Sequence, residues 1–167
     1  MMKINKIGTT AILISLRGFT APAAVSGASP EMRVTSVSPD TVFFFTDSIS
    51  GMQGTQGIVQ VRQRNFQDIL SVQGSVSWDT AVATFDSITF YGLPDMSNAN
   101  FGMTIVSGGV LTFSWNDPTL MGVTRGDSTA TFGMSFHLTG NPGAQTPVTL
   151  SDSPVVWEVS DTSLQVL

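Results

Sequence analysis

The chain has 167 residues, a length that suits one domain together with a short leader. Its 12 acidic and 7 basic residues give a net charge of −5, so it lacks the clustered Lys and Arg that bind nucleic-acid phosphates. It contains no Cys, which excludes disulfides and thiolate metal sites. Only 11% of the residues are charged, against about 25% in an average protein, and such surfaces are common on secreted β proteins.

The N-terminus has the pattern of an export leader. Two lysines precede an apolar run at residues 7–16, and Ala21-Pro22-Ala23 offers the small-x-small pattern that signal peptidases cleave. The run is too short for a transmembrane helix, which needs about 20 residues. We therefore predict a leader over residues 1–28, the alternative being a disordered tail, and a folded domain over residues 33–167. The protein is then expected to be secreted or exposed at the cell surface, without a membrane span.

Beyond Pro30, apolar and polar residues alternate almost everywhere, and no window sustains a helical repeat. Pieces rich in Gly, Pro, Asn and Asp separate the alternating segments. The pattern predicts an antiparallel β-sandwich of about nine strands, of jelly-roll or immunoglobulin-like type. In chain order, the expected strands lie within 41–50, 57–66, 72–78, 82–85, 101–106, 109–115, 130–138, 146–159 and 163–167.

The stretch VQGSVSWDTAVATF, residues 72–85, shows how one strand divides its two faces. Val72, Val76 and Trp78 alternate with polar residues and are expected to point into the core. Asp79 follows the tryptophan and is expected to cap the turn that ends the strand. The polar alternates then form an outward surface that is either solvated or available to a partner.

Chemistry-bearing residues do not form a recognisable catalytic set. His137 is the only histidine, and its strand pattern predicts an exposed side chain. The carboxylates follow strands, where Asp usually bonds its own backbone. Because no phosphate loop, EF-hand or zinc spacing occurs, we predict that the chain is not an enzyme and has no cofactor, with calcium held by loop oxygens as a weaker alternative.

The aromatic residues bear on a carbohydrate-binding alternative. Trp78 and Trp115 share their strand faces with apolar residues and are expected in the core. The direction of Trp157 is left open by its place at the start of a segment, and Tyr91 is a further candidate for stacking on a sugar. A line of at least two exposed aromatic rings would indicate polysaccharide as the ligand.

The segment GIVQVRQRNFQDILSVQGSVSWDTAVATFDSI resembles bacterial cohesin domains, which belong with the family 2 and 3 carbohydrate-binding modules in one superfamily. GVLTFSWND, GDSTATFGMSFHLTG and TPVTLSD followed by EVSD are similar to later strands of that family, so the resemblance covers roughly residues 36–167. The matching residues of the first segment are Val59, Val61, Asn65, Phe66, Ile69, Trp78, Asp79, Val82 and Phe85.

The resemblance implies an all-β fold, a nine-stranded antiparallel β-sandwich with jelly-roll topology. It also implies a non-catalytic adaptor that holds dockerin modules, which are calcium-loaded helix pairs, in polysaccharide-degrading or cell-surface assemblies. The alternatives are a carbohydrate-binding module and a structural surface or filament subunit joined by β-augmentation. On the sheet that the family uses for binding, the expected contact residues are Ser71, Gln73, Ser75, Thr112, Ser114 and Asn116.

Overall fold

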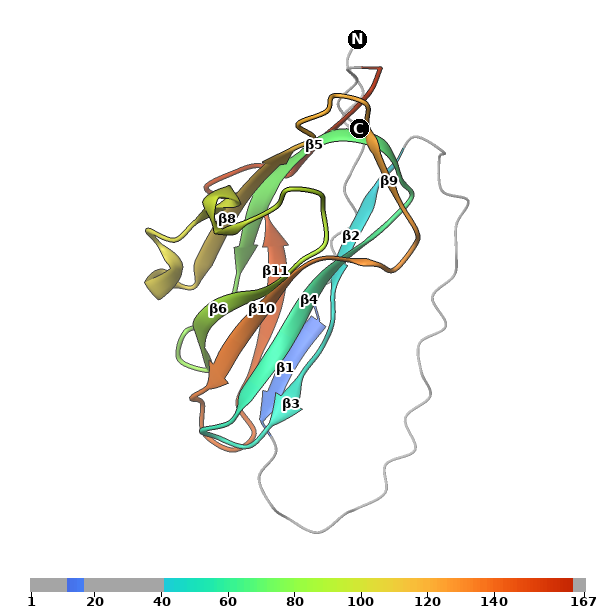
Figure 1. Cartoon of the computed structure of the whole chain (residues 1–167). Helices are drawn as coiled ribbons and strands as arrows, with labels where there is room; N and C mark the ends of the chain where they lie inside the picture. The colour runs from blue at the N-terminus through green and yellow to red at the C-terminus, as the bar shows by residue number, and fades with distance from the viewer. Residues whose placement is uncertain (1–11, 17–40, 164–167) are drawn as a thin grey trace.

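The computed structural model describes residues 12–16 and 41–163 (Figure 1), and the structural statements below concern this part of the chain. None of its helices is long and apolar enough to cross a membrane. The strands are β1 (Ile12–Leu16), β2 (Phe43–Thr46), β3 (Ser50–Gly51), β4 (Gln56–Arg64), β5 (Phe66–Ser77), β6 (Ala83–Tyr91), β7 (Phe101–Gly102), β8 (Val110–Asn116), β9 (Val123–Arg125), β10 (Ala130–Leu138), β11 (Gln145–Ser151) and β12 (Glu158–Asp161), with short 3-10 helices η1 (Asn98–Asn100) and η2 (Val106–Gly108).

Two β-sheets pack face to face, which confirms the predicted sandwich (Figure 1). One sheet has the order β2-β4-β10-β6. The other has the order β3-β1-β11-β5-β8-β7, and β9 and β12 also pair with β5. The pairs are antiparallel except for β1 with β3.

The predicted number of nine strands is wrong, because two expected segments are interrupted and because β1 and β9 form where no strand was expected. The segment expected at 41–50 divides into β2 and β3, and the segment at 146–159 divides into β11 and β12. In the second case, residues 152–157 leave the sheet before the chain pairs again with β5. The sequence does mark this break, because Asp152-Ser153-Pro154 is followed by the consecutive apolar residues at 155–157, and the expectation of a single strand overlooked it.

The core is formed by the alternate residues that the period of two assigns to the interior. Phe132, Met134 and Phe136 of β10 are fully buried, and so are Val72 and Val76 of β5 in the other sheet. The predicted exposure of His137, between Phe136 and Leu138, is also confirmed.

The predicted corner at Trp78 and Asp79 is confirmed as well. Trp78 is 7% exposed and meets the Phe136 ring edge-on, with 5.1 Å between the ring centroids. Asp79 accepts a hydrogen bond at Oδ1 from the Ala81 backbone N–H at 2.8 Å. The aspartate therefore caps the turn while the tryptophan fills the core.

β1 lies within the segment that the sequence assigns to the leader. Its backbone pairs antiparallel with β11, from Ile12 opposite Val148 to Ser15 opposite Gln145, and parallel with β3. It therefore covers the outer edge of β11. The leader itself stays a prediction, and most of the strand expected at 163–167 lies outside the described residues.

Candidate functional site

The predicted contact residues come together as facing pairs on two neighbouring strands. Ser71 of β5 lies opposite Asn116 of β8, Gln73 opposite Ser114, and Ser75 opposite Thr112. The alternating residues Val72, Gly74 and Val76 of β5 are buried on the other side of the sheet. Since successive side chains of a strand point to opposite faces, all six predicted residues belong to one outward face.

Five of these six residues are accessible to a partner, and Ser75 is not. Ser114 and Asn116 are exposed, and Ser71, Gln73 and Thr112 are half-buried. Ser75 is 0% exposed, so its inclusion in the contact set is corrected. Its hydroxyl donates to the Val155 carbonyl and accepts from the Val155 N–H, both at 2.9 Å. The segment that leaves the sheet between β11 and β12 covers it.

Trp157 anchors this segment, residues 152–157, to the sheet. Its side chain is 5% exposed, and Nε1 donates to the Ser75 carbonyl at 2.7 Å. The indole lies against Gly74, where an added Cβ would be 2.5 Å from the ring atoms Cδ2 and Cε2. The direction that the sequence left open is therefore inward, and the outward Ser75 is covered because Trp157 holds the segment in place.

Two residues of β12 extend the surface, and sequence reasoning missed them. Glu158 lies opposite Gln73, whose Nε2 donates to its carboxylate at 3.1 Å, and Ser160 lies opposite Ser71. The alternation of Glu158, Val159 and Ser160 gave the needed signal, because Val159 is buried and its neighbours face outward. We call the combined surface the polar face, and it consists of Ser71, Gln73, Thr112, Ser114, Asn116, Glu158 and Ser160.

A second excursion, residues 117–122, leaves the sheet at the other side of β5, between β8 and β9. It begins at Asp117, which is 2% exposed. The Asp117 carboxylate accepts from the Thr119 N–H at 3.0 Å, the Met121 N–H at 3.1 Å and the Gly122 N–H at 2.9 Å. Burial raises the pKa of Asp117, but the hydrogen bonds from Thr119, Gly122 and Met121 outweigh burial and hold that pKa below its ordinary value. The loop is therefore fixed around an ionised carboxylate.

The polar face offers hydrogen bonds and negative charge but no basic group. The three strands that supply it, β5, β8 and β12, contain no Lys or Arg, and Arg125 lies on β9, opposite Phe66 at the start of β5. Within the described residues, no group of three or more His, Cys, Asp or Glu could hold a metal ion. His137 lies on β10, in the other sheet. The arrangement suits recognition of a basic or polar protein surface.

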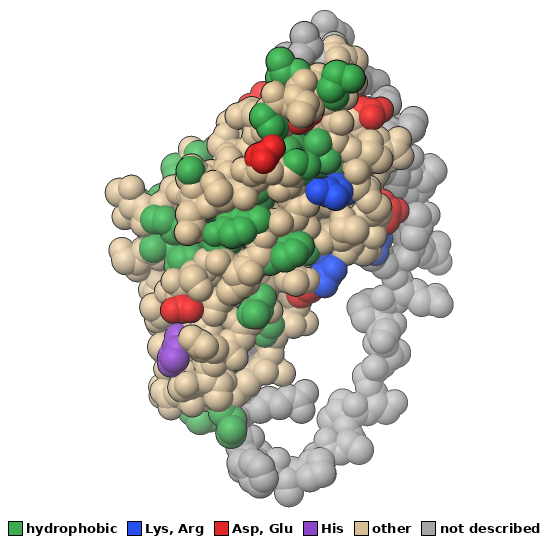
Figure 2. Space-filling view, viewed as in Figure 1, with side chains coloured by type: hydrophobic (Ala, Val, Ile, Leu, Met, Phe, Trp, Pro, Cys, Tyr) green, Lys and Arg blue, Asp and Glu red, His purple; other side chains and the backbone are tan. Residues whose placement is uncertain are grey.

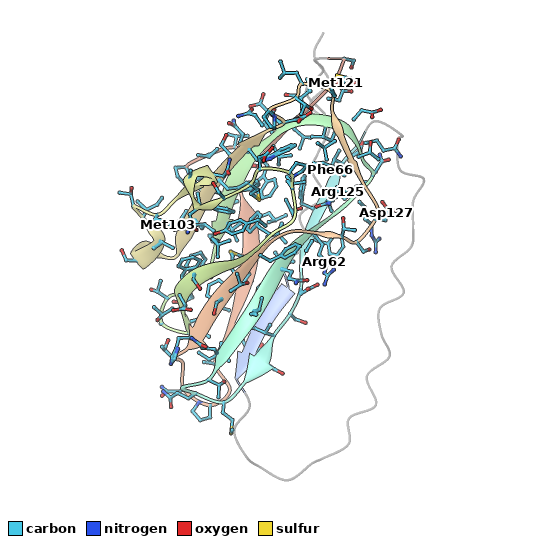
Figure 3. The ribbon with its side chains drawn as sticks, in the orientation of Figure 1. Arg62, Phe66, Met103, Met121, Arg125 and Asp127 are labelled. Carbon is cyan, nitrogen blue, oxygen red and sulfur yellow. The ribbon has the colours of Figure 1, made fainter. Side chains whose placement is uncertain are left out.

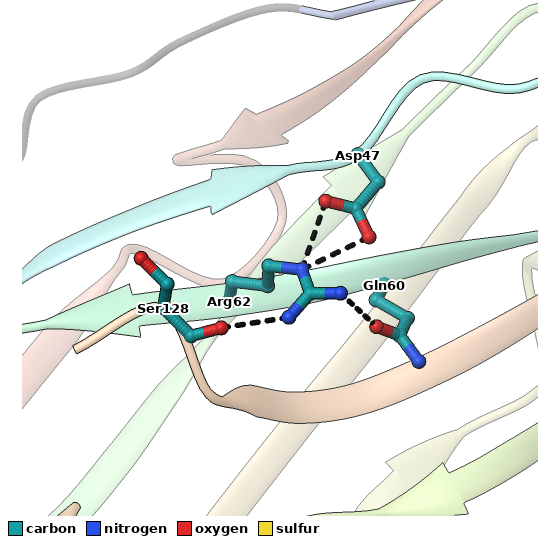
Figure 4. A network of polar contacts seen from close by, with 4 residues as sticks. All are labelled: Asp47, Gln60, Arg62 and Ser128. Atoms are coloured by element: carbon teal, nitrogen blue, oxygen red, sulfur yellow. Dashed lines mark hydrogen bonds and ion pairs between the residues drawn. The ribbon is translucent and has the colours of Figure 1, made fainter. Parts of the chain in front are cut away.

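The outer face of the other sheet carries exposed apolar side chains and arginine (Figure 2). Its Arg62 bonds to Asp47 at 2.9 Å, to the Gln60 side chain and to the Ser128 carbonyl (Figure 4). These internal contacts occupy the guanidinium. Ile58 and Phe90 are exposed on either side of Gly133.

The four aromatic residues weighed for sugar stacking do not supply the line of exposed rings that the carbohydrate-binding alternative requires. Trp78, Trp115 and Trp157 are 7%, 1% and 5% exposed, respectively, which confirms the prediction for the first two. Tyr91 is 36% exposed, and its hydroxyl donates to Asn98. Among the four aromatic residues considered for sugar stacking, Tyr91 alone reaches the surface.

No family model and no curated protein matches this chain, whereas solved structures of cohesin modules match most of it. One is the cohesin CaCohA2 of Clostridium acetobutylicum, in a complex with CaDoc0917, with 19% identity, a TM-score of 0.63, and coverage of 76% of this chain and 92% of that one. A second is the type I cohesin of a cohesin–dockerin complex from Clostridium thermocellum, with 11% identity, a TM-score of 0.61, and coverage of 77% and 92%.

A third is a type II cohesin domain from the cellulosome of Acetivibrio cellulolyticus, with 13% identity, a TM-score of 0.57, and coverage of 76% and 86%. The likeness includes both type I and type II modules. At such identities it establishes the fold, so this chain has the β-sandwich of cohesin modules.

Proposed function

We propose that the chain is a non-catalytic adaptor module that binds a dockerin-like helical module through the polar face. The observation that carries the proposal is the pairing of Gln73 with Ser114 and of Ser71 with Asn116 on one accessible surface. The fold shared with cohesins that were solved in dockerin complexes supports the same conclusion.

The chemistry of the polar face favours a protein ligand over a sugar. Its side chains are hydroxyls, amides and one carboxylate, and no aromatic ring stands among them to stack on a sugar. Residues directly opposite each other on antiparallel strands have Cβ atoms about 5 Å apart. The paired side chains therefore present closely spaced donors and acceptors, which suit the exposed polar side chains of a helix.

The proposed setting is extracellular, in a secreted or cell-surface assembly. The low charge content and the leader pattern at residues 1–28 support this setting. Binding would place the partner, and any enzyme joined to it, on the assembly that carries this chain. This chain would then determine which partner is bound and where it is held, and it would catalyse no reaction itself.

The test is calorimetric titration of the purified chain against a panel of purified type I and type II dockerin modules, with calcium and with a chelator. Wild type is expected to bind at least one module 1:1 in calcium. Gln73→Arg combined with Ser114→Arg should weaken that binding at least about tenfold, because two arginines obstruct the centre of the face. The matched control, Thr84→Arg with Ser87→Arg, changes exposed residues of β6 and should bind like wild type. Absence of binding to every dockerin, or equal binding by the Gln73 and Ser114 variant, would overturn the proposal.

A further inference from the structure

Two large apolar side chains stand in water beside the polar face. Leu120 and Met121 are 73% and 77% exposed, the highest values among the large apolar residues in the described part of the chain. They belong to the excursion 117–122, which follows Asn116 directly. Figure 3 shows Met121 at the end of the molecule where β8 leads toward β9. At this level of exposure they contribute little to the packing of the fold.

The loop holds these two side chains in a fixed arrangement. The buried Asp117 carboxylate binds the backbone N–H groups before and after Leu120, as described above. Leu120 itself has φ of 56°, in the left-handed region that bulky residues rarely adopt. Such strain persists only where the surroundings impose it. Because the loop is already ordered, a partner that contacts it loses little conformational entropy.

The polar face is too small to form a stable interface alone, so a partner must also contact residues around it. A stable interface buries about 800 Å² on each side, which corresponds to a patch roughly 30 Å across. The three rows of β5 from Ser71 to Ser75 span only about 13 Å along the strand. A partner of ordinary size, centred on Gln73, therefore also covers the excursions on either side of β5. Interfaces draw most of their affinity from a few side chains that become desolvated, and the polar face has no large apolar side chain to serve in this way.

The negative charge of this region indicates which charge the partner's surface should carry. Glu158 stands on the polar face, and Asp68 is exposed next to the loop, where Gly122 packs against its backbone. The polar face itself contains no Lys or Arg, and the one basic residue on the described strands of this sheet is Arg125 of β9, opposite Phe66. A basic partner surface would be attracted and an acidic one repelled.

We propose that Leu120 and Met121 are the apolar anchor of the interface, and that they pack against the apolar side of an amphipathic helix whose Lys or Arg side chains approach Glu158. The inference rests on the proposed function and adds the chemistry of the partner's helix. Helices bind in this way when apolar residues at helical spacing meet an apolar surface. The anchor supplies affinity, while the polar face selects the partner and its orientation.

The experiment uses the complete chain and the dockerin that binds wild type most tightly in the panel above. Leu120→Ser with Met121→Ser should raise Kd at least about 30-fold, as loss of a hot spot does. The matched control is Met52→Ser, because Met52 is 64% exposed and follows β3 at the opposite end of the sandwich (Figure 1). This control should leave Kd unchanged. Circular dichroism and thermal melting check that the variants stay folded, as their exposure predicts.

The outcomes separate the anchor from the polar face. If the Kd of the Leu120 and Met121 variant is within about threefold of wild type while the Gln73 and Ser114 variant no longer binds, the anchor is overturned and the proposed function stands. The reverse result keeps the anchor and overturns the polar face. No binding by wild type overturns both. Glu158→Gln should slow association and flatten its salt dependence, and an unchanged salt dependence would overturn the basic partner.

Discussion

The contact between Gly74 and Trp157 joins the core to the candidate site, and it can be measured by a double-mutant cycle. A methyl group at Gly74 would lie 2.5 Å from the indole ring. β5 pairs with β8 on one side and with β12 on the other, so its backbone has little freedom to move away. Gly74→Ala is therefore expected to lower the free energy of unfolding by about 1–3 kcal/mol, the usual cost of overpacking.

Trp157→Ala is expected to remove the cost of Gly74→Ala. The indole centroid lies 4.8 Å from the centroid of Phe44 and 5.0 Å from that of Phe113, so truncation leaves a large cavity and should cost about 3–5 kcal/mol. In this background the methyl of Gly74→Ala enters the cavity. The substitution should then be neutral or stabilising by up to about 1 kcal/mol, because Gly in a strand interior is less stable than Ala by roughly that amount.

Urea unfolding of the four proteins measures the coupling free energy, with the fluorescence of the buried Trp78 and Trp115 as the probe. Gly108→Ala is the control, since a Cβ there would meet nothing within 4 Å. It should change stability by less than about 0.5 kcal/mol. If Gly74→Ala costs the same with and without the indole, to within about 0.5 kcal/mol, the proposed contact does not exist.

Three further predictions follow from other parts of the structure. The folded-state pKa of Asp117 is lowered, so its contribution to stability is complete above its unfolded pKa of about 3.9 and is lost as the pH falls through the lower folded value. The NMR amide signals of the Asp117 loop should therefore move only below about pH 4. Changes of these signals above about pH 5 would contradict the lowered pKa. Asp47→Asn should cost less than about 1 kcal/mol in urea unfolding, because Asp47 and Arg62 are each about one third exposed, and a larger loss would show a stronger pair. Removal of residues 1–28 should speed hydrogen exchange at 145–148, where β1 pairs with β11, and unchanged exchange would show that this pairing does not protect the edge.

The sequence predicts the interior well because one physical rule governs it. Along β8 the period of two separates buried from outward residues, whereas on β10 Thr131 and Ser135 are buried together with the apolar face. The residues that carry the likeness to cohesins are mostly part of this interior. Val59, Val61, Phe66 and Ile69 are fully buried, and Val82 is 6% exposed. The resemblance therefore identifies a packing pattern, which is why it predicts the fold.

Glu158 and Ser160 could have been predicted from their alternation with Val159, but the borders of the site could not, because they depend on where the chain leaves the sheet. Asp152-Ser153-Pro154 marks the excursion 152–157 in the sequence, but only the structure shows that Val155 covers Ser75. The loop 117–122 reads in sequence as an ordinary turn. Its display of Leu120 and Met121 depends on the hydrogen bonds that Asp117 accepts. Both features arise from contacts between residues that are far apart in the alternating pattern, so the pattern carries no signal of them.

The two faces of β5 are under different constraints, which explains how the same fold accompanies 11–19% identity to the matched cohesins. Val72 and Val76 must fill the core, whereas Ser71 and Gln73 can change without loss of packing. Ser75 is the exception among the outward residues of this segment. Its hydroxyl and carbonyl are bonded to the segment that Trp157 anchors, so a change there alters the core and the border of the polar face together. Under the proposed function, partner choice can therefore diverge through the remaining outward residues and through Leu120 and Met121, whose exposure lets them change without loss of packing.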